Sequence, residues 1–373
     1  MRITKVEVEK VQLPLTMQIQ DRRPQAQSYW GLKVIAKIST DEGLVGAGVT
    51  DLVHREWGQT PEAVYETIAR FYGPAIIGQD PFDIEVVMDK MNDVFEFSQI
   101  PEVAVFARTA IDMALYDLMG KAASVPVCRL LGGRRLAEVP VAMSVYVNEP
   151  KIMAKDAIQK VKRGYKELKL KVGLKLEQDI AMVKAVREAV GDDIGMRVDA
   201  NGAWNAHKAV QAIKKLERFG ILLVEQPVPR WDIKGLATVR RRIDTPIEVD
   251  ESLHSIQDAR VLIENDACDV FNIKLVKLGG LYNSRKVVTL AESGNITCRM
   301  GSEAESGLGA LACAHLVSSA KNFDYGADGL GRGWYKGDIT VQDVVVDKGC
   351  LKVPEKPGLG AELDENKVKQ HRI

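Results

Sequence analysis

Cysteine and histidine are scarce in this chain of 373 residues, with five of each. The cysteines are odd in number and widely scattered, and no Cys-x-x-Cys pair or disulfide framework is present, which favours a reducing compartment. An excess of charge is also missing, because Lys+Arg and Asp+Glu both number 51. The sequence therefore offers no net charge that would attract nucleic acid or an anionic membrane.

Long hydrophobic runs are missing too. No apolar stretch is long enough to span a bilayer, and the first residues, MRITKVEVEKVQLPL, alternate like a strand and lack the apolar run of a signal peptide. Neither a GxGxxG motif nor a P-loop follows any strand pattern, which argues against nucleotide binding. These absences predict a soluble cytoplasmic protein that binds neither nucleic acid nor a membrane.

Two different patterns of secondary structure divide the chain. Residues 1–50 predict two or three strands, and 61–72 and 103–123 predict helices, so roughly the first 125 residues indicate an α+β unit. From residue 139 onward, eight strand patterns alternate with helical ones at a step of roughly 25 residues, which favours a (β/α)₈ barrel over an open doubly wound sheet. The expected strands are 139–146, 166–172, 194–200, 221–227, 246–252, 269–275, 296–302 and 323–328.

Charged residues recur at the ends of these expected strands, where the active sites of such barrels lie. Asp199, Glu225 and Asp250 are spaced at nearly equal steps, and three carboxylates that converge there would repel one another unless a cation lay between them. An all-oxygen set suits Mg²⁺, whereas zinc would recruit histidine or cysteine. Any one of these residues alone is more often a helix cap or a surface charge, but caps have no reason to recur at one depth on adjacent strands. The residues are Lys169, Lys171, Asp199, Asn201, Glu225, Asp250, Glu251 and Lys274.

These motifs resemble the enolase superfamily, specifically the muconate-lactonizing-enzyme (muconate cycloisomerase) subgroup of the mandelate racemase/muconate lactonizing enzyme family. The resemblance covers essentially the whole chain and implies an α/β fold: a modified, TIM-like (β/α)₇β barrel with an α+β N-terminal capping domain. We therefore expect the capping domain at 1–125, the catalytic barrel at 126–350, and a C-terminal segment, 351–373, that returns to the capping domain. The matching stretches are LKLKVG (168–173), RVDAN (197–201), VEQP (224–227), VDES (249–252), NIKLVKLGG (272–280), ES-G-LG (305–309), TAIDMALYDLMGK and LLGG.

By this resemblance, Asp199, Glu225 and Asp250 would bind Mg²⁺, with Mn²⁺ as the alternative ion. Lys171 and Lys274 would face each other across a substrate carboxylate. When the α-proton is removed, a metal ion bound to the substrate carboxylate would stabilise the negative charge of the enolate that forms.

The base must be a neutral amine, although free lysine titrates at about 10.4. Lys169 lies two residues before Lys171 and so on the same strand face. The charge of one ammonium group is expected to lower the pKa of the other, which would explain why the strand carries both.

The residue set leaves the fate of the enolate open. A racemase or epimerase of an N-substituted amino acid is the preferred reading, in which one lysine removes the α-proton and the other returns it to the opposite face. A muconate-type cycloisomerase, a lyase of the o-succinylbenzoate synthase type and a non-catalytic metal-binding barrel are the alternatives. The His–Asp pair of relatives that resemble mandelate racemase is not expected, because strand seven reads ITCRMGS and strand six presents Lys274.

Specificity is expected to come from the capping domain, through loops at about 17–31 and 51–60, and from the last strand. Dipeptide epimerases of the subgroup carry an Asp-x-Asp on strand eight that holds the ammonium group of the substrate, whereas this chain has Gly326 and Asp328. That departure argues against a dipeptide with a free amine. The expected partners are a small-molecule carboxylate and, in a homo-oligomer, further copies of the chain. The candidates for substrate binding or for the layer behind the site are Asn201, Glu251, Ser302, Glu305, Asp328, Tyr29 and Trp30.

Overall fold

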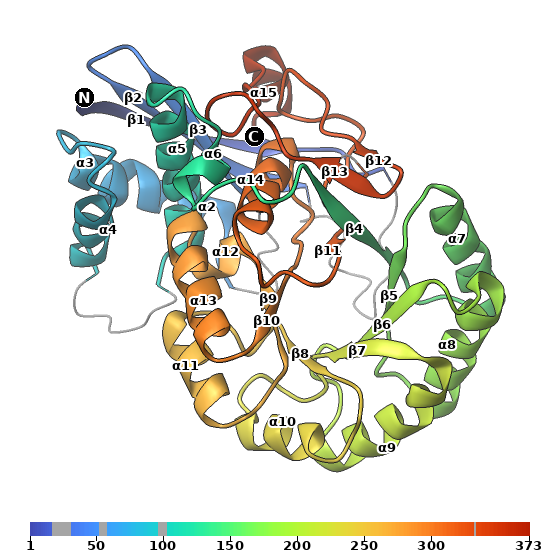
Figure 1. Ribbon diagram of the computed structural model, residues 1–373. Helices are drawn as coiled ribbons and strands as arrows, with labels where there is room; N and C mark the ends of the chain where they lie inside the picture. The colour runs from blue at the N-terminus through green and yellow to red at the C-terminus, as the bar shows by residue number, and fades with distance from the viewer. Residues whose placement is uncertain (17–30, 52–57, 96–102, 332) are drawn as a thin grey trace.

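The computed structural model describes residues 1–16, 31–51, 58–95, 103–331 and 333–373. A unit built from the first part of the chain lies beside a barrel built from the remainder (Figure 1). The candidates Tyr29 and Trp30 lie outside the described residues. No helix among those described is both long and apolar enough to cross a membrane.

The N-terminal unit contains an antiparallel sheet in the order β1-β2-β3, covered by helix α5 (Val105–Ala122). Gly46 and Gly48 let the helix approach closely, because a Cβ on either would lie 2.2 Å from Ala114 O or 2.1 Å from Ala110 O. The α+β pattern expected for this part of the chain is confirmed. The other elements are β1 (Ile3–Gln12), β2 (Leu32–Thr40), β3 (Val45–Asp51), α2 (Pro61–Thr67), the π-turn η2 (Ile68–Tyr72), α3 (Gly73–Ile76) and α4 (Ile84–Asp93).

The barrel strands β4 to β10 are parallel and neighbour one another in chain order, and β11 pairs with β4 from the other side. A single bridge between Cys298 and Phe323 joins β10 to the segment that leads into β11. All eight expected strands are present, although the later ones are shorter than their patterns. The strands are β4 (Glu138–Val145), β5 (Glu167–Lys171), β6 (Gly195–Asp199), β7 (Ile221–Glu225), β8 (Ile247–Val249), β9 (Val270–Ile273), β10 (Thr297–Met300) and β11 (Ala327–Asp328).

Helices follow the first seven barrel strands and form the outer ring seen in Figure 1. After β11 the described chain contains no further helix until α15 (Glu365–His371), so the architecture is (β/α)₇β, as the resemblance implies, and not (β/α)₈. The helices that follow the strands are α7 (Pro150–Lys162), α8 (Leu176–Val190), α9 (Ala206–Leu216) with the 3₁₀ turn η3 (Glu217–Phe219), α10 (Ile233–Arg240), α11 (Ile256–Glu264), α12 (Leu275–Leu278), α13 (Leu281–Ser293) and α14 (Gly307–Ser319). The short helix α6 (Val127–Leu130) precedes β4.

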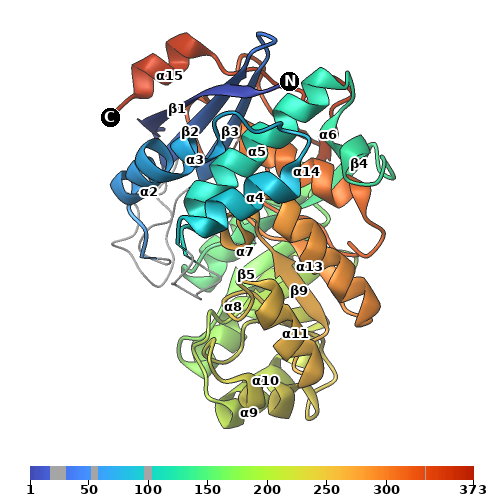
Figure 2. The ribbon, with the colours of Figure 1, turned by 90° about the vertical axis from the view of Figure 1, so that its left-hand side faces the viewer.

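The last part of the chain returns to the N-terminal sheet. Strand β13 (Cys350–Lys352) pairs with β4 on one side and with β12 (Val346–Asp347) on the other. The backbone N–H of Ile373 donates to Lys10 O at 3.1 Å. Helix α15 therefore lies beside β1, at the opposite end of the molecule from α9 and α10 (Figure 2).

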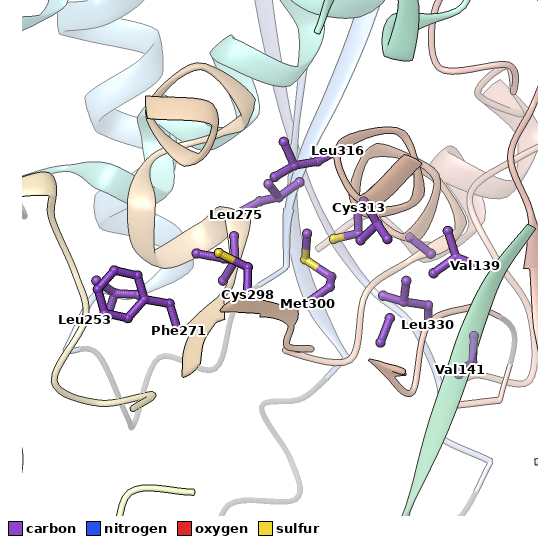
Figure 3. Close-up of a cluster of buried hydrophobic side chains, with 14 of the residues drawn as sticks. Val139, Val141, Leu253, Phe271, Leu275, Cys298, Met300, Cys313, Leu316 and Leu330 are labelled. Atoms are coloured by element: carbon purple, nitrogen blue, oxygen red, sulfur yellow. The ribbon is translucent and has the colours of Figure 1, made fainter. Parts of the chain in front are cut away.

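Part of the core fills the space between β4, the paired strands β9 and β10, and helix α14 (Figure 3). Val141 and Met300 lie in this cluster, whereas Phe271 lies beside Leu253 on the side of β9 away from β4, and all three are fully or almost fully buried. Cys298 and Cys313 lie in the same cluster as free thiols, and burial raises the pKa of both. They serve as small apolar core residues there.

Candidate active site

Three carboxylates meet at the carboxyl edge of neighbouring barrel strands. Asp199 is the last residue of β6 and Glu225 the last residue of β7, and the two are paired in register. Asp250 follows directly after β8. All three are buried, with exposed fractions of 0%, 0% and 3%. Active sites of this barrel type are built at this edge, and three buried acids there need nearby positive charge.

Ammonium groups supply that charge. Lys171 Nζ donates to Asp199 Oδ2 at 2.6 Å, and Lys274 Nζ donates to Asp250 Oδ2 at 2.8 Å. Lys169 Nζ lies 2.7 Å from Glu225 Oε2 and 3.1 Å from Asp199 Oδ2. The structure thus brings together all six residues that the sequence singles out for metal binding and proton transfer.

The three carboxyl groups differ in their ionisation. Burial opposes the charge of Asp199 and Asp250, but the neighbouring lysines outweigh it and hold the pKa of both below the usual range. Burial and the charge of Asp199 raise the pKa of Glu225 despite its contacts with cations. A further positive charge beside Glu225 would therefore favour its ionised form.

Lys169 and Lys171 extend from the same face of β5 into different surroundings. Burial alone would lower the pKa of Lys169, but Glu225 and Asp199 outweigh it and raise that pKa, so Lys169 stays a cation. Its side chain is 6% exposed, whereas that of Lys171 is 20% exposed. Lys171 Nζ also donates to Asn201 Oδ1 at 3.0 Å. Lys171 is thus the more accessible of the pair, as a base that meets substrate requires.

Lys274 lies on the other side of the three carboxylates. It follows β9 as the N-cap residue of α12, and its Nζ donates to Glu303 Oε1 at 2.6 Å in addition to Asp250. Glu305 holds the Glu303 segment in place, because its carboxylate accepts from the backbone N–H of Glu303 at 2.7 Å and from Ser302 Oγ at 2.5 Å. Burial and the nearby Asp51 raise the pKa of Glu305 to about 7. Ser302 and Glu305 are thus linked to Lys274 through the segment that contains Glu303.

Glu251 and Asp328, two further candidates, occupy different places. Asn201 Nδ2 donates to Glu251 Oε1 at 3.0 Å, while the other oxygen, Oε2, is buried without a hydrogen-bond partner among the described residues. Burial and the charges of Asp250 and Asp199 raise the pKa of Glu251 to about 8. Both carboxylate oxygens of Asp328 instead form ion pairs with basic side chains that point into the barrel.

A layer of arginines lies beneath the carboxylates, and it contains the residues that the sequence reasoning missed. Arg299 Nη1 lies 2.9 Å from Asp328 Oδ2, and Arg299 Nη2 lies 3.1 Å from Glu225 Oε2. Arg197 binds Glu225 at 3.3 Å, Glu167 at 2.7 Å and the remaining oxygen of Asp328. Arg197 lies two residues before Asp199 and therefore on the same face of the strand, so the alternation of side chains along the strand could have identified it. The other residues missed are Glu248, Asn272, Lys277 and Glu303.

The charges of this cluster fit a divalent cation. Side-chain ion pairs and hydrogen bonds join eight acidic side chains to six basic ones among the described residues, and with Glu251 protonated near neutral pH seven carboxylates remain against six cations. The unsatisfied oxygen of Glu251 and the all-oxygen donor set agree with a hard ion. As they stand, no three acidic, histidine or cysteine side chains in the described chain have the geometry of a metal cluster. The acids are Glu167, Asp199, Glu225, Glu248, Asp250, Glu251, Glu303 and Asp328, and the bases are Lys169, Lys171, Arg197, Lys274, Lys277 and Arg299.

Two family models match the chain. The model described as mandelate racemase / muconate lactonizing enzyme, N-terminal domain, matches residues 2–132, and the model described as enolase C-terminal domain-like matches residues 153–367.

Individual relatives span nearly the same length. The chain is 41% identical to a hydrophobic dipeptide epimerase of Enterococcus faecalis over 87% of this chain and 90% of that protein. It is 34% identical to an N-succinyl-L-Arg/Lys racemase of Bacillus cereus over 99% of this chain and 98% of that protein. The crystal structure of the dipeptide epimerase from E. faecalis complexed with Mg and the dipeptide L-Leu-L-Tyr superposes with a TM-score of 0.88 at 37% identity, covering 97% of this chain and 100% of that one.

Proposed function

The chain belongs to the mandelate racemase/muconate lactonizing enzyme family of the enolase superfamily and is an isomerase, and from this premise we propose that it is a Mg²⁺-dependent racemase or epimerase of N-substituted amino acids. The observation that carries the proposal is the placement of two lysines on either side of one set of carboxylates. Lys171 contacts Asp199 at the end of β6, and Lys274 contacts Asp250 directly after β8. Glu225 ends β7, which lies between β6 and β8 in the sheet order. Such a pair can remove a proton from one face of a carbon atom and return it to the other.

Asp199, Glu225 and Asp250 would hold the divalent cation, with Glu251 beside them. When bound, the cation would stabilise the negative charge that develops on the substrate carboxylate as its α-proton leaves. The residues of the chain do the remaining work. Lys171 Nζ or Lys274 Nζ takes the proton, and the other lysine delivers one to the opposite face.

The network around each lysine supports this division of roles. Asn201 and Asp199 orient Lys171, while Glu303 and Asp250 orient Lys274. Each amine is therefore held by hydrogen bonds at a fixed place, as proton transfer requires.

The class of substrate follows from what the named relatives share. An N-succinyl amino acid and the second residue of a dipeptide both have a free carboxylate and an acylated nitrogen on the same α-carbon. Asp328 favours a substrate without a free terminal ammonium group, such as an N-succinyl amino acid, because cations of the barrel interior occupy both of its oxygens. Gly326 offers no second carboxylate, and a Cβ there would lie 3.3 Å from Glu167 Oε2. An acidic side chain at 326 would thus meet an existing negative charge.

Proton exchange in D₂O tests the proposal. The enzyme with Mg²⁺ is incubated with both enantiomers of N-succinyl and N-acetyl amino acids, with dipeptides and with muconate, and NMR follows the α-proton. We expect deuterium to enter from both enantiomers of an N-acylated substrate. Lys171→Ala and Lys274→Ala should each lower abstraction from one enantiomer by about 10²-fold or more.

Lys166→Ala is the matched control, because Lys166 is exposed and precedes β5 on the opposite alternation. It should exchange at the wild-type rate. Absence of α-exchange with every carboxylate in the panel would refute the proposal. Lactone formation from muconate without racemisation would favour a cycloisomerase, and loss of water to an alkene would favour a lyase.

A further inference from the structure

Gln226 joins the three loops that follow β6, β7 and β8, next to the carboxylates of the proposed metal site. It follows Glu225 directly and is fully buried. Its backbone carbonyl accepts from the N–H of Gly202, in the loop after β6, at 2.8 Å, and its own N–H donates to Glu248 O of β8 at 2.8 Å. Its side chain reaches the loop after β8. One residue therefore contacts all three loops.

The side-chain amide of Gln226 uses every hydrogen-bonding position that it has. Oε1 accepts from the backbone N–H of Asp250 at 3.0 Å and from that of Ser252 at 3.1 Å. Nε2 donates to Ser252 Oγ at 2.8 Å and to Val228 O at 2.8 Å. Two acceptor and two donor positions are all that a primary amide offers. The backbone of Asp250 is thus fixed by a side chain from the strand that ends in Glu225.

The backbone of Gln226 has a conformation that its own residue type does not favour. Its φ is +38°, in the left-handed region where asparagine, aspartate and glycine are enriched and glutamine is not. Such a conformation persists only where the surrounding contacts determine it, and it is concentrated at functional sites. The hydrogen bonds to Asp250, Ser252 and Gly202 are those contacts here.

We propose that Gln226 is a positioning residue that sets the place of Asp250 relative to Glu225 and Asp199, and through it the affinity of the site for its divalent cation. The inference rests on the proposed function, because it assumes a cation at these carboxylates. Gln226 acts through the Asp250 loop and does not contact the substrate. Loss of such an outer hydrogen bond commonly lowers metal affinity by 10- to 100-fold.

The test measures Mn²⁺ binding by titration calorimetry without substrate, so that the readout does not depend on turnover. Gln226→Met removes all four side-chain hydrogen bonds, and Gln226→Asn keeps the amide but shortens it by one methylene group. Both variants should raise the Mn²⁺ dissociation constant by about tenfold or more. Gln226→Glu keeps the length and the acceptor oxygen that faces Asp250, so it should bind Mn²⁺ more tightly than Gln226→Asn does.

Two control variants separate positioning from general destabilisation. Gln178→Met makes the same chemical change on the exposed face of α8 and should keep the wild-type dissociation constant. His315→Gln breaks a buried hydrogen bond on α14, away from the site, and should lower thermal stability while keeping Mn²⁺ affinity. Wild-type Mn²⁺ affinity in folded Gln226→Asn, or in folded Gln226→Met, would overturn the inference. Failure of the wild-type protein to bind Mn²⁺ would instead refute the metal site of the proposed function, and this inference with it.

Discussion

Replacing His315 by glutamine should remove a pH dependence of stability that the structure assigns to this one ring. His315 is fully buried on α14. Its Nδ1 accepts from the backbone N–H of Cys128 at 3.3 Å, and its Nε2 donates to Leu359 O at 3.2 Å. A backbone N–H can only donate and a carbonyl can only accept, so both bonds require the neutral ring with its proton on Nε2. Protonation of Nδ1 would place two N–H groups against each other.

Burial lowers the pKa of His315 from 6.5 to about 4. The unfolded chain therefore binds a proton between these two values that the folded chain does not. The stability that this ring contributes is complete above pH 6.5 and is lost as the pH falls toward 4. Between pH 7.5 and pH 5.0 the linkage amounts to about 2 kcal/mol of unfolding free energy.

Urea unfolding followed by tryptophan fluorescence measures this loss in the wild type and in His315→Gln at both pH values. The other titrating groups are common to the two proteins, so they cancel in the difference between the two pH effects. Wild type should lose about 2 kcal/mol more than the variant on going to pH 5.0. His207→Gln, on the exposed face of α9, is the matched control and should behave like wild type. A wild-type excess below about 0.5 kcal/mol, within the error of additivity, would refute the reasoning.

Two further predictions concern the metal and a buried ion pair between β2 and β3 of the N-terminal sheet. Removal of divalent cations with EDTA should abolish α-proton exchange, and added Mg²⁺ should restore it; retention of exchange in EDTA would contradict the metal assignment. Lys33→Met should lower the unfolding free energy by about 3–5 kcal/mol, because it leaves the buried Asp51 without the ammonium group 3.1 Å away. Thermal unfolding measures this loss, and Lys33→Met combined with Asp51→Asn should recover part of it; a double variant less stable than Lys33→Met would count against the ion pair.

The sequence predicted the barrel and the meeting of the six lysines and carboxylates at one edge of it, because the topology of the fold leaves little freedom. A parallel barrel brings the carboxyl ends of all strands to one edge, so residues at the ends of separate strands must meet. Lys171, Asp199 and Glu225 are the last residues of their strands, and the first two and the last two are paired in register.

The height of Asp250 and Lys274 along the barrel could not be predicted from the spacing of residues in the sequence. The steps from Asp199 to Glu225 and from Glu225 to Asp250 are nearly equal in the sequence, yet Glu225 pairs with Glu248. Asp250 and Lys274 lie beyond the ends of their strands, in the loops that follow. Strands of a barrel are staggered against one another, so register and tilt set the height of a side chain. Register and tilt depend on tertiary packing, and the spacing of residues along the sequence gives no information about that packing.

The buried cations beneath the carboxylates show how the barrel can keep the site in place before any metal binds. In a buried cluster of acids without nearby cations, the carboxylates would repel one another and move apart, or they would take up protons. Here Arg197 and Arg299 contact Glu225 from below, and Lys169 contacts both Glu225 and Asp199. Most of the negative charge is thus compensated within the fold, so the barrel should stay folded in EDTA. At a concentration 100 times its dissociation constant, Mg²⁺ should add only about 2.7 kcal/mol of stability. The acidic side chains that outnumber the basic ones are therefore available for binding the cation, while the charge pairs below maintain the structure.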